Sequence, residues 1–194
     1  MSVVLNEADR SQAKRFHAEN SQTSAKSQRL VSIARYILLM AIIACAAVAG
    51  FFYAYACSVM YGLNDSAPTV ALEAMQGINR TVRNPIFALS FFGTALLLPL
   101  AAALTFVAGS KKAGAVLAIS AIVYFGGGFV LTMAINVPMN NALAMVDVST
   151  LTDPAKAWAD YEGPWSFWNW TRTEFSFLAL LPATLTFGFR SRQA

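Results

Sequence analysis

Three uncharged segments restrict this chain of 194 residues to a membrane environment. They begin at Tyr36, Pro85 and Ala113, and each is longer than the roughly 20 residues that a helix needs to cross a bilayer. Charged residues make up only 12% of the chain, whereas soluble domains carry roughly 25%. We therefore expect an all-α integral membrane protein.

The uncharged segments and their flanks predict a four-helix bundle. We expect one membrane domain over residues 31–194, with spans at about 36–60, 85–108, 113–135 and 170–189. The apolar part of the last span, Phe175 to Phe189, is short, so the tryptophan-rich turns before it should complete the span at the interface. Residues 1–30 are polar and mixed in charge, which predicts a cytoplasmic tail that is disordered or briefly helical.

Short interfacial helices are expected outside the spans. One is predicted at residues 69–83, and Asn84-Pro85 has the sequence of an N-cap followed by a first-turn proline. Another is predicted to begin at Asp153-Pro154 and to end at Gly163, after which Pro164 opens the last helix.

The basic residues are divided unequally between the two ends of the predicted spans. Ten of the 14 Lys and Arg residues lie in the tail and at the start of the first span, in the turn at 109–112 and at the C-terminus. The other four are Arg80, Arg83, Lys156 and Arg172. The positive-inside rule then places both termini in the cytoplasm and the interfacial helices on the periplasmic side. We expect a multi-pass protein of the bacterial inner membrane.

The segment Ile135–Asn141 places three amides and a proline at the end of an apolar helix. Pro138 lacks an N–H group, so the helix is expected to kink or break there. Amides have no water partner in lipid and must face protein or a cavity. Asn136 and Asn140 lie four residues apart and share a face if the helix resumes. They either form one wall of a polar pocket or repair the broken backbone.

Three separated segments, 72–83, 135–141 and 165–174, are expected to meet on the periplasmic side. Arg172 shares one helix face with two tryptophans and an asparagine before it, although it can also reach water at the bilayer edge, with the tryptophans forming an interfacial belt. The candidate substrate-binding residues are Gln76, Asn79, Asn136, Asn140, Asn141, Trp165, Trp168 and Asn169; the candidate catalytic residues are Glu174 and Arg172.

Metal and nucleic-acid sites are not expected. The single histidine, His17, lies in the polar tail, and Cys45 and Cys57 are twelve residues apart on one predicted helix. No cluster of metal-ligating residues occurs in the apolar part, so we expect neither metal nor bound cofactor. The expected partners are membrane lipid, a small lipophilic aromatic ligand and a membrane-protein partner; nucleic acid is not expected because the basic residues are clustered near the spans.

Four phrases, spread over roughly residues 45–190, resemble the signature of the anthrone oxygenase-like family. They are Met75-Gln76-Gly77-Ile78-Asn79, Asn84-Pro85-Ile86-Phe87, Asn136-Val137-Pro138-Met139-Asn140, and Trp165-x-x-Trp168-Asn169-x-x-Arg172. The resemblance implies a four-helix membrane protein, from a family whose assigned members oxidise anthrones to anthraquinones with O₂ and no cofactor. Relatives often carry a histidine where this chain has Trp170.

That activity requires donors that stabilise an anion and a base that forms it. Arg172 and the amides are the expected donors, and Trp165 and Trp168 are expected to stack on a planar substrate. Glu174 is the candidate base, with Glu73 as an alternative. The competing hypothesis is a non-enzymatic accessory or structural subunit of a larger membrane complex.

Overall fold

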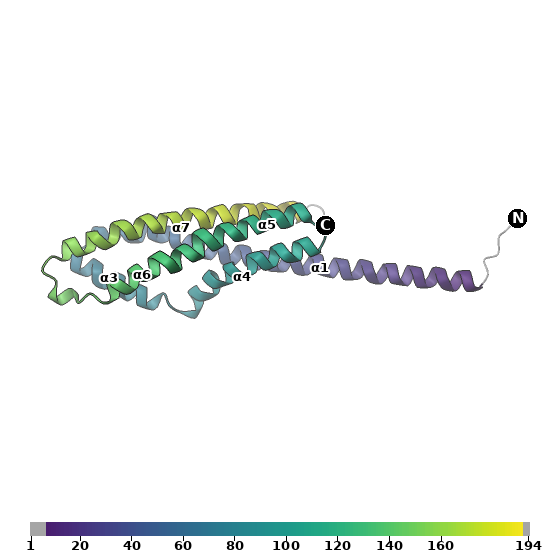
Figure 1. Cartoon of the computed structure of the whole chain (residues 1–194), viewed down its shortest axis with the longest axis horizontal. Helices are drawn as coiled ribbons and strands as arrows, with labels where there is room; N and C mark the ends of the chain where they lie inside the picture. Colours follow the sequence, from purple (N-terminus) through teal and green to yellow (C-terminus); the bar gives the residue numbers. More distant parts are fainter. Residues whose placement is uncertain (1–6, 192–194) are drawn as a thin grey trace.

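The computed structural model describes residues 7–191, and all regular structure in this range is helical, which confirms the all-α class (Figure 1). The elements are α1 (Glu7–Ala54), η1 (Tyr55–Val59), α2 (Met60–Asn64), α3 (Pro68–Thr81), α4 (Pro85–Val107), α5 (Lys111–Val123), η2 (Tyr124–Val130), η3 (Thr132–Asn136), α6 (Val137–Ala144), η4 (Val148–Thr150) and α7 (Pro154–Ser191). The segments η1, η2 and η3 have π-helical winding, and η4 is a single 3₁₀ turn.

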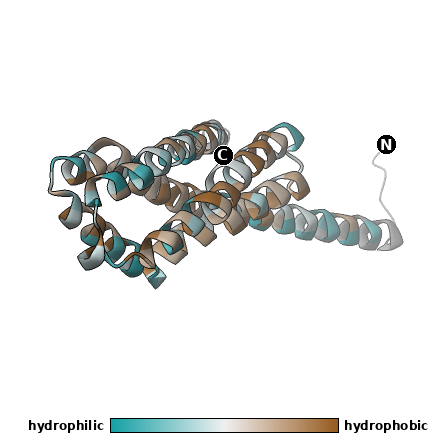
Figure 2. Ribbon diagram, turned by 60° about the vertical axis from the view of Figure 1, so that its left-hand side comes forward, coloured by the Kyte–Doolittle hydropathy of each residue, from teal (hydrophilic) through white to brown (hydrophobic). Residues whose placement is uncertain are grey.

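Three helical stretches of the described chain are long and apolar enough to cross a membrane. They lie within Arg15–Asn64, Pro85–Val107 and Lys111–Ala144. The outward face of α4 is apolar, with Ile86, Leu89 and Leu96 between 70% and 83% exposed. Figure 2 shows hydrophobic residues along these helices and hydrophilic residues on the N-terminal part of α1. These features fit a multi-pass membrane protein, and the fourth span, on α7, stays a prediction.

The long helices lie side by side and form two apolar cores (Figure 1). The larger core joins α1, α4, α5 and α7 and includes Leu38, Phe52, Leu98 and Leu117. The smaller core, at the end that carries α3 and α6, includes Leu72, Met75 and Trp165. The N-terminal part of α1 projects beyond the other helices at the opposite end.

The described part of the N-terminal tail, predicted as disordered or briefly helical, is helical throughout. Helix α1 begins at Glu7 and runs without interruption into the first apolar segment. No glycine or proline occurs between Glu7 and Leu30, and a helix that is already formed extends at little cost through such a sequence. Residues 1–6 lie outside the described range.

The chain remains helical through Pro138, so of the two expected outcomes, a kink or a break, the break does not occur. The five residues of η3 directly before Val137 have π-helical winding, and α6 continues from there to Ala144. A proline in an α-helix clashes with the carbonyl four residues earlier, and the wider π turn relieves that clash while keeping the helix continuous.

Helix α7 is likewise one continuous helix from Pro154 to Ser191, so the predicted end at Gly163 and restart at Pro164 are wrong. Gly163 does not have the positive φ of a helix-ending glycine. The carbonyl that Pro164 leaves without an N–H belongs to Asp160, which is exposed, so polar surroundings satisfy it. The caps Asn84 and Asp153 are confirmed: their side chains accept from the N–H groups of Phe87 and Lys156.

One glycine of the Gly126–Gly128 triplet is required by packing between η2 and α7. A Cβ atom on Gly127 would overlap the Cβ and Cγ atoms of Phe175, whereas a Cβ atom on Gly126 would meet nothing within 4 Å. Gly127 therefore permits the close approach of α7, as small residues do between membrane helices.

We predict that Gly127→Ala lowers the stability of the protein and that Gly126→Ala does not. Overpacking a close contact costs about 1–3 kcal/mol, while alanine at the open position gains helix propensity. Thermal unfolding of both variants in detergent checks this. Equal midpoints for the two variants would contradict the packing role of Gly127.

Candidate functional site

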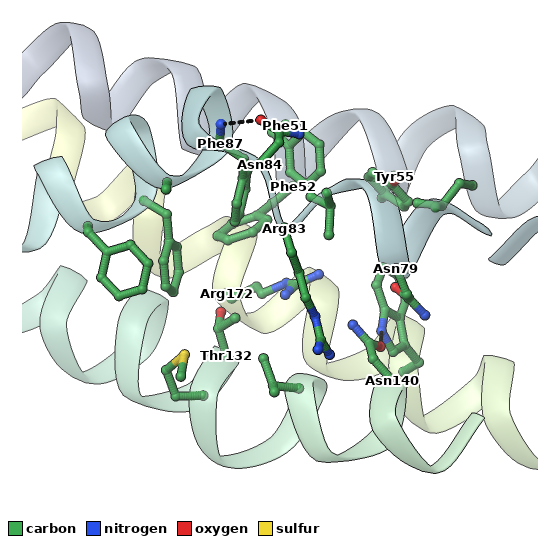
Figure 3. Close-up of a pocket in the computed structure, with 18 of the residues that line it drawn as sticks. Phe51, Phe52, Tyr55, Asn79, Arg83, Asn84, Phe87, Thr132, Asn140 and Arg172 are labelled. Atoms are coloured by element: carbon green, nitrogen blue, oxygen red, sulfur yellow. Dashed lines mark hydrogen bonds between the residues drawn. The ribbon is translucent and has the colours of Figure 1, made fainter. Parts of the chain in front are cut away.

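A cavity of about 600 Å³ lies between the two cores (Figure 3). Its walls come from α1 and η1, from α3, from α4 and the turn before it, and from η3, α6 and α7. The lining residues include Phe51, Phe52, Tyr55, Asn79, Arg83, Asn84, Phe87, Phe91, Phe92, Thr132, Met133, Asn140, Trp165 and Arg172. The cavity is therefore mainly aromatic, with a small number of polar groups, as is usual for small-molecule sites.

Arg172 is the buried cation of this cavity. It is only 5% exposed, and its Cζ atom lies 4.2 Å from the ring centroid of Phe52 and 5.1 Å from that of Trp165. No acidic residue of the described chain forms an ion pair with it. The two aromatic faces offset part of the cost of burying the charge, but they do not neutralise it.

Asn169 fixes the direction of the Arg172 side chain. Its Oδ1 atom accepts hydrogen bonds from Nε and Nη2 of Arg172 at 3.0 and 2.8 Å. Its Nδ2 atom donates to the backbone carbonyl of Phe52 at 3.0 Å, which ties α7 to α1. A guanidinium has five N–H donors, so Arg172 keeps donors for a ligand after both bonds to Asn169 are made.

A second network holds the end of the cavity that is closest to α3. Oδ1 of Asn140 accepts from the Tyr161 hydroxyl at 3.0 Å and from Trp165 Nε1 at 2.8 Å, and Asn79 Nδ2 donates to the Tyr161 oxygen at 3.2 Å. Burial raises the pKa of the Tyr161 phenol well above its usual range, so it acts as a neutral donor and not as a base. These bonds orient the Asn140 amide, leaving its Nδ2 donor for other partners.

Arg83 lies in the turn between α3 and α4 and is exposed while also lining the cavity. Its Nη2 atom donates to Oδ1 of Asn141 on α6. Figure 3 shows the Arg83 side chain extending from this turn toward Asn140 and Arg172. The cavity thus carries one buried and one exposed guanidinium.

Helical winding changes on two walls of the cavity. The η1 segment begins at Tyr55, three residues after Phe52, and η3 contains Thr132 and Met133. Segments of π-helix are frequent at functional sites because they redirect side chains within a continuous helix. Here they place these three side chains on the cavity surface.

The structure brings together only part of the predicted site. Asn79, Asn140, Trp165 and Arg172 line the cavity, and Asn169 supports Arg172 from behind. Asn141 contributes through its bond to Arg83.

The other predicted site residues lie outside the cavity lining. Gln76 donates to the carbonyls of Leu143 and Val146 at the end of α6 and so has a structural role. Glu174 is exposed and does not line the cavity, which leaves it without a path to act as the base. Half-buried Trp168 packs against Phe167, and Glu73 is also exposed and outside the lining.

Asn136 is a separate case. It is fully buried, one helical turn from both Thr132 and Asn140, yet neither polar atom of its amide has a hydrogen-bond partner within the described chain. An unsatisfied buried amide costs about 1–3 kcal/mol. The Asn136 amide therefore does not repair the backbone at Pro138, because it makes no hydrogen bond to a carbonyl or N–H group there.

The sequence did not predict several residues of the site: Arg83, Tyr55, Tyr161 and the phenylalanines of α1 and α4. The side-chain spacing of residues 76–83 places Arg83 near the face of Asn79, which is the one signal that indicated it. Tyr161 was assigned to a separate short helix, and only the continuous α7 aligns it with Trp165.

The family comparison fits this geometry. The family model described as anthrone oxygenase matches residues 87–182, from α4 into α7. This segment is similar to the anthrone oxygenase family over just under half of the chain. The resemblance seen in the sequence is thereby confirmed for this segment, which contains Asn140, Trp165 and Arg172. No curated protein and no solved structure matches the chain. The cavity walls from α1 and α3 lie outside the anthrone oxygenase match.

We predict that replacing asparagine by leucine destabilises the protein at position 140 but not at position 136, one helical turn earlier. Asn140→Leu leaves the buried donors of Tyr161 and Trp165 without their acceptor and should cost about 1–3 kcal/mol. Asn136→Leu keeps the branched side-chain shape, removes the unsatisfied amide, and should not destabilise the protein. Thermal unfolding in detergent compares the two variants, and an equal loss in both would show that Asn136 has a polar partner in solution.

Proposed function

We propose that the protein is a multi-pass enzyme of the bacterial inner membrane that oxygenates an anthrone-like substrate with O₂ and no cofactor. In this proposal both termini are cytoplasmic, α7 provides the fourth span, and the cavity opens near the periplasmic face. The family match supports the substrate class. The observation that carries the proposal is Arg172, a buried cation on the cavity wall without an acidic partner in the described chain.

An uncompensated guanidinium selects an anionic ligand. Buried charges are normally paired because desolvation is costly, and here the aromatic rings and Asn169 are neutral partners. An enolate or phenolate oxygen at Arg172 would supply the missing charge. The surrounding rings favour a planar aromatic body, and about 600 Å³ is within the usual range for such a ligand.

The reaction then needs few protein groups. Loss of one proton from the substrate methylene gives an enolate, whose oxygen Arg172 stabilises as a preorganised donor. The methylene carbon forms a bond to O₂, and the resulting peroxide loses water. One oxygen atom becomes the new carbonyl of the anthraquinone, and the other leaves as water with the two methylene hydrogens. Oxygen is thus the only oxidant required.

The proton acceptor is solvent in this proposal. No carboxylate, histidine or cysteine is among the described residues that line the cavity, and the exposed position of Arg83 gives water a route to the substrate. The same observation favours a second candidate, a non-enzymatic accessory protein whose cavity binds an aromatic anion without turnover.

We predict that Arg172→Gln lowers the enzymatic oxidation of a dihydroxyanthrone by about 100-fold or more, the usual effect of removing a donor to a reaction anion. The measurement is aerobic quinone formation by purified protein in detergent, corrected for the spontaneous rate. Arg80→Gln is the matched control, because Arg80 is exposed and does not line the cavity.

The pH profile separates stabilisation of the anion from a structural effect. Arg172 lowers the pKa of the bound substrate, so kcat, which reports ionisations in the enzyme–substrate complex, should rise with pH at lower values in the wild type than in Arg172→Gln. A displacement of one pH unit corresponds to about 1.36 kcal/mol. Tight binding without turnover in the wild type would favour the accessory role, and failure of the wild type both to bind and to oxidise the anthrone would refute both candidates.

A further inference from the structure

We propose that Arg83 forms a second anionic subsite in the cavity, which selects aromatic substrates that carry a carboxylate in addition to the oxygen bound at Arg172. This inference rests on the proposed function for the aromatic class of the ligand. It adds a specificity-determining residue and a substituent that the family match does not indicate, since Arg83 precedes the matched residues 87–182.

Two positive charges line the cavity without an acidic partner in the described chain. Arg83 and Arg172 line the same cavity, and no acidic residue of the described chain pairs with either of them. The bond from Arg83 to Asn141 reaches a neutral amide, so it orients the guanidinium without cancelling its charge. A ligand with one anionic oxygen balances one of the two cations, and a ligand with two acidic groups balances both.

The polar side chains next to Arg83 are already engaged in hydrogen bonds within the protein. The side chain of Asn84 caps α4 through Phe87 N and donates to the Thr81 carbonyl. Asn79 and the Oδ1 atom of Asn140 are bonded to Tyr161. These amides are engaged in holding the walls together, whereas the Arg83 guanidinium has four N–H donors beyond the one given to Asn141.

Arg83 lies at the exposed edge of the cavity. A carboxylate bound there keeps part of its hydration, so its desolvation cost is small, and the planar fork of arginine binds carboxylates in a bidentate manner. The aromatic body lies in the apolar part of the cavity. Screening by salt limits the strength of an exposed pair, and we therefore expect a preference of about tenfold in affinity, the effect of one charge-assisted hydrogen bond.

The test compares two dihydroxyanthraquinones that differ in one substituent: rhein, which carries a carboxylate, and chrysophanol, which carries a methyl group there. Quenching of tryptophan fluorescence gives both dissociation constants for the purified full chain in a non-ionic detergent. The wild-type ratio is compared with those of Arg83→Gln, Arg83→Lys and the control Arg80→Gln. Comparing ratios removes the difference in how the two ligands partition into micelles.

We expect the preference for rhein to fall about tenfold in Arg83→Gln, to be partly kept in Arg83→Lys, and to be unchanged in Arg80→Gln. Added salt should weaken the binding of rhein and not that of chrysophanol. An unchanged ratio in Arg83→Gln, with both ligands bound, would overturn the Arg83 subsite and leave the proposed function intact. Failure of the wild type to bind either ligand would also overturn the Arg83 subsite, and the anthrone oxidation assay would then decide the proposed function separately.

Discussion

The buried charge of Arg172 is the constraint around which the cavity is organised. Removing an ion from water costs on the order of several kcal/mol, and the protein offsets this cost with neutral groups only: the Asn169 amide and the rings of Phe52 and Trp165. An acidic partner would have stabilised the chain more and would have competed with an anionic ligand. The arrangement therefore sacrifices stability for an electrostatic preference inside the cavity.

That arrangement depends on the way the helices pack. Asn169 reaches the Phe52 carbonyl because α7 lies against α1, and Gly127 lets Phe175 of α7 pack against η2. The winding changes to π in η1, which follows α1, and in η3, which precedes α6, and both segments border the cavity. The larger core supplies Phe52 for one contact of the cation, and the smaller core supplies Trp165, which contacts the cation and donates to Asn140.

The sequence was sufficient to predict the helical class, the caps Asn84 and Asp153, and the convergence of Asn140, Trp165 and Arg172, because apolar length and helical spacing are local properties. It did not predict the continuity of the helices at Pro138 and Pro164. A proline indicates that a hydrogen bond is lost, but the wider winding or polar exposure that compensates for it depends on tertiary surroundings. The prediction also could not distinguish Asn140, which has partners, from Asn136, which has none.

The chain divides the site between two parts of its length. The anthrone oxygenase segment contributes Arg172, Trp165 and Asn140, the groups that would stabilise the reacting oxygen and orient the aromatic body. The preceding part contributes Phe52, Asn79 and Arg83 from α1, α3 and the turn before α4. Phe52 covers one face of Arg172, and in the proposed function Asn79 and Arg83 would contact the periphery of the ligand, so substitutions at those two residues would change which substrates fit while the anion-stabilising donor stays in place. Chemistry and selectivity can thus vary separately in one cavity.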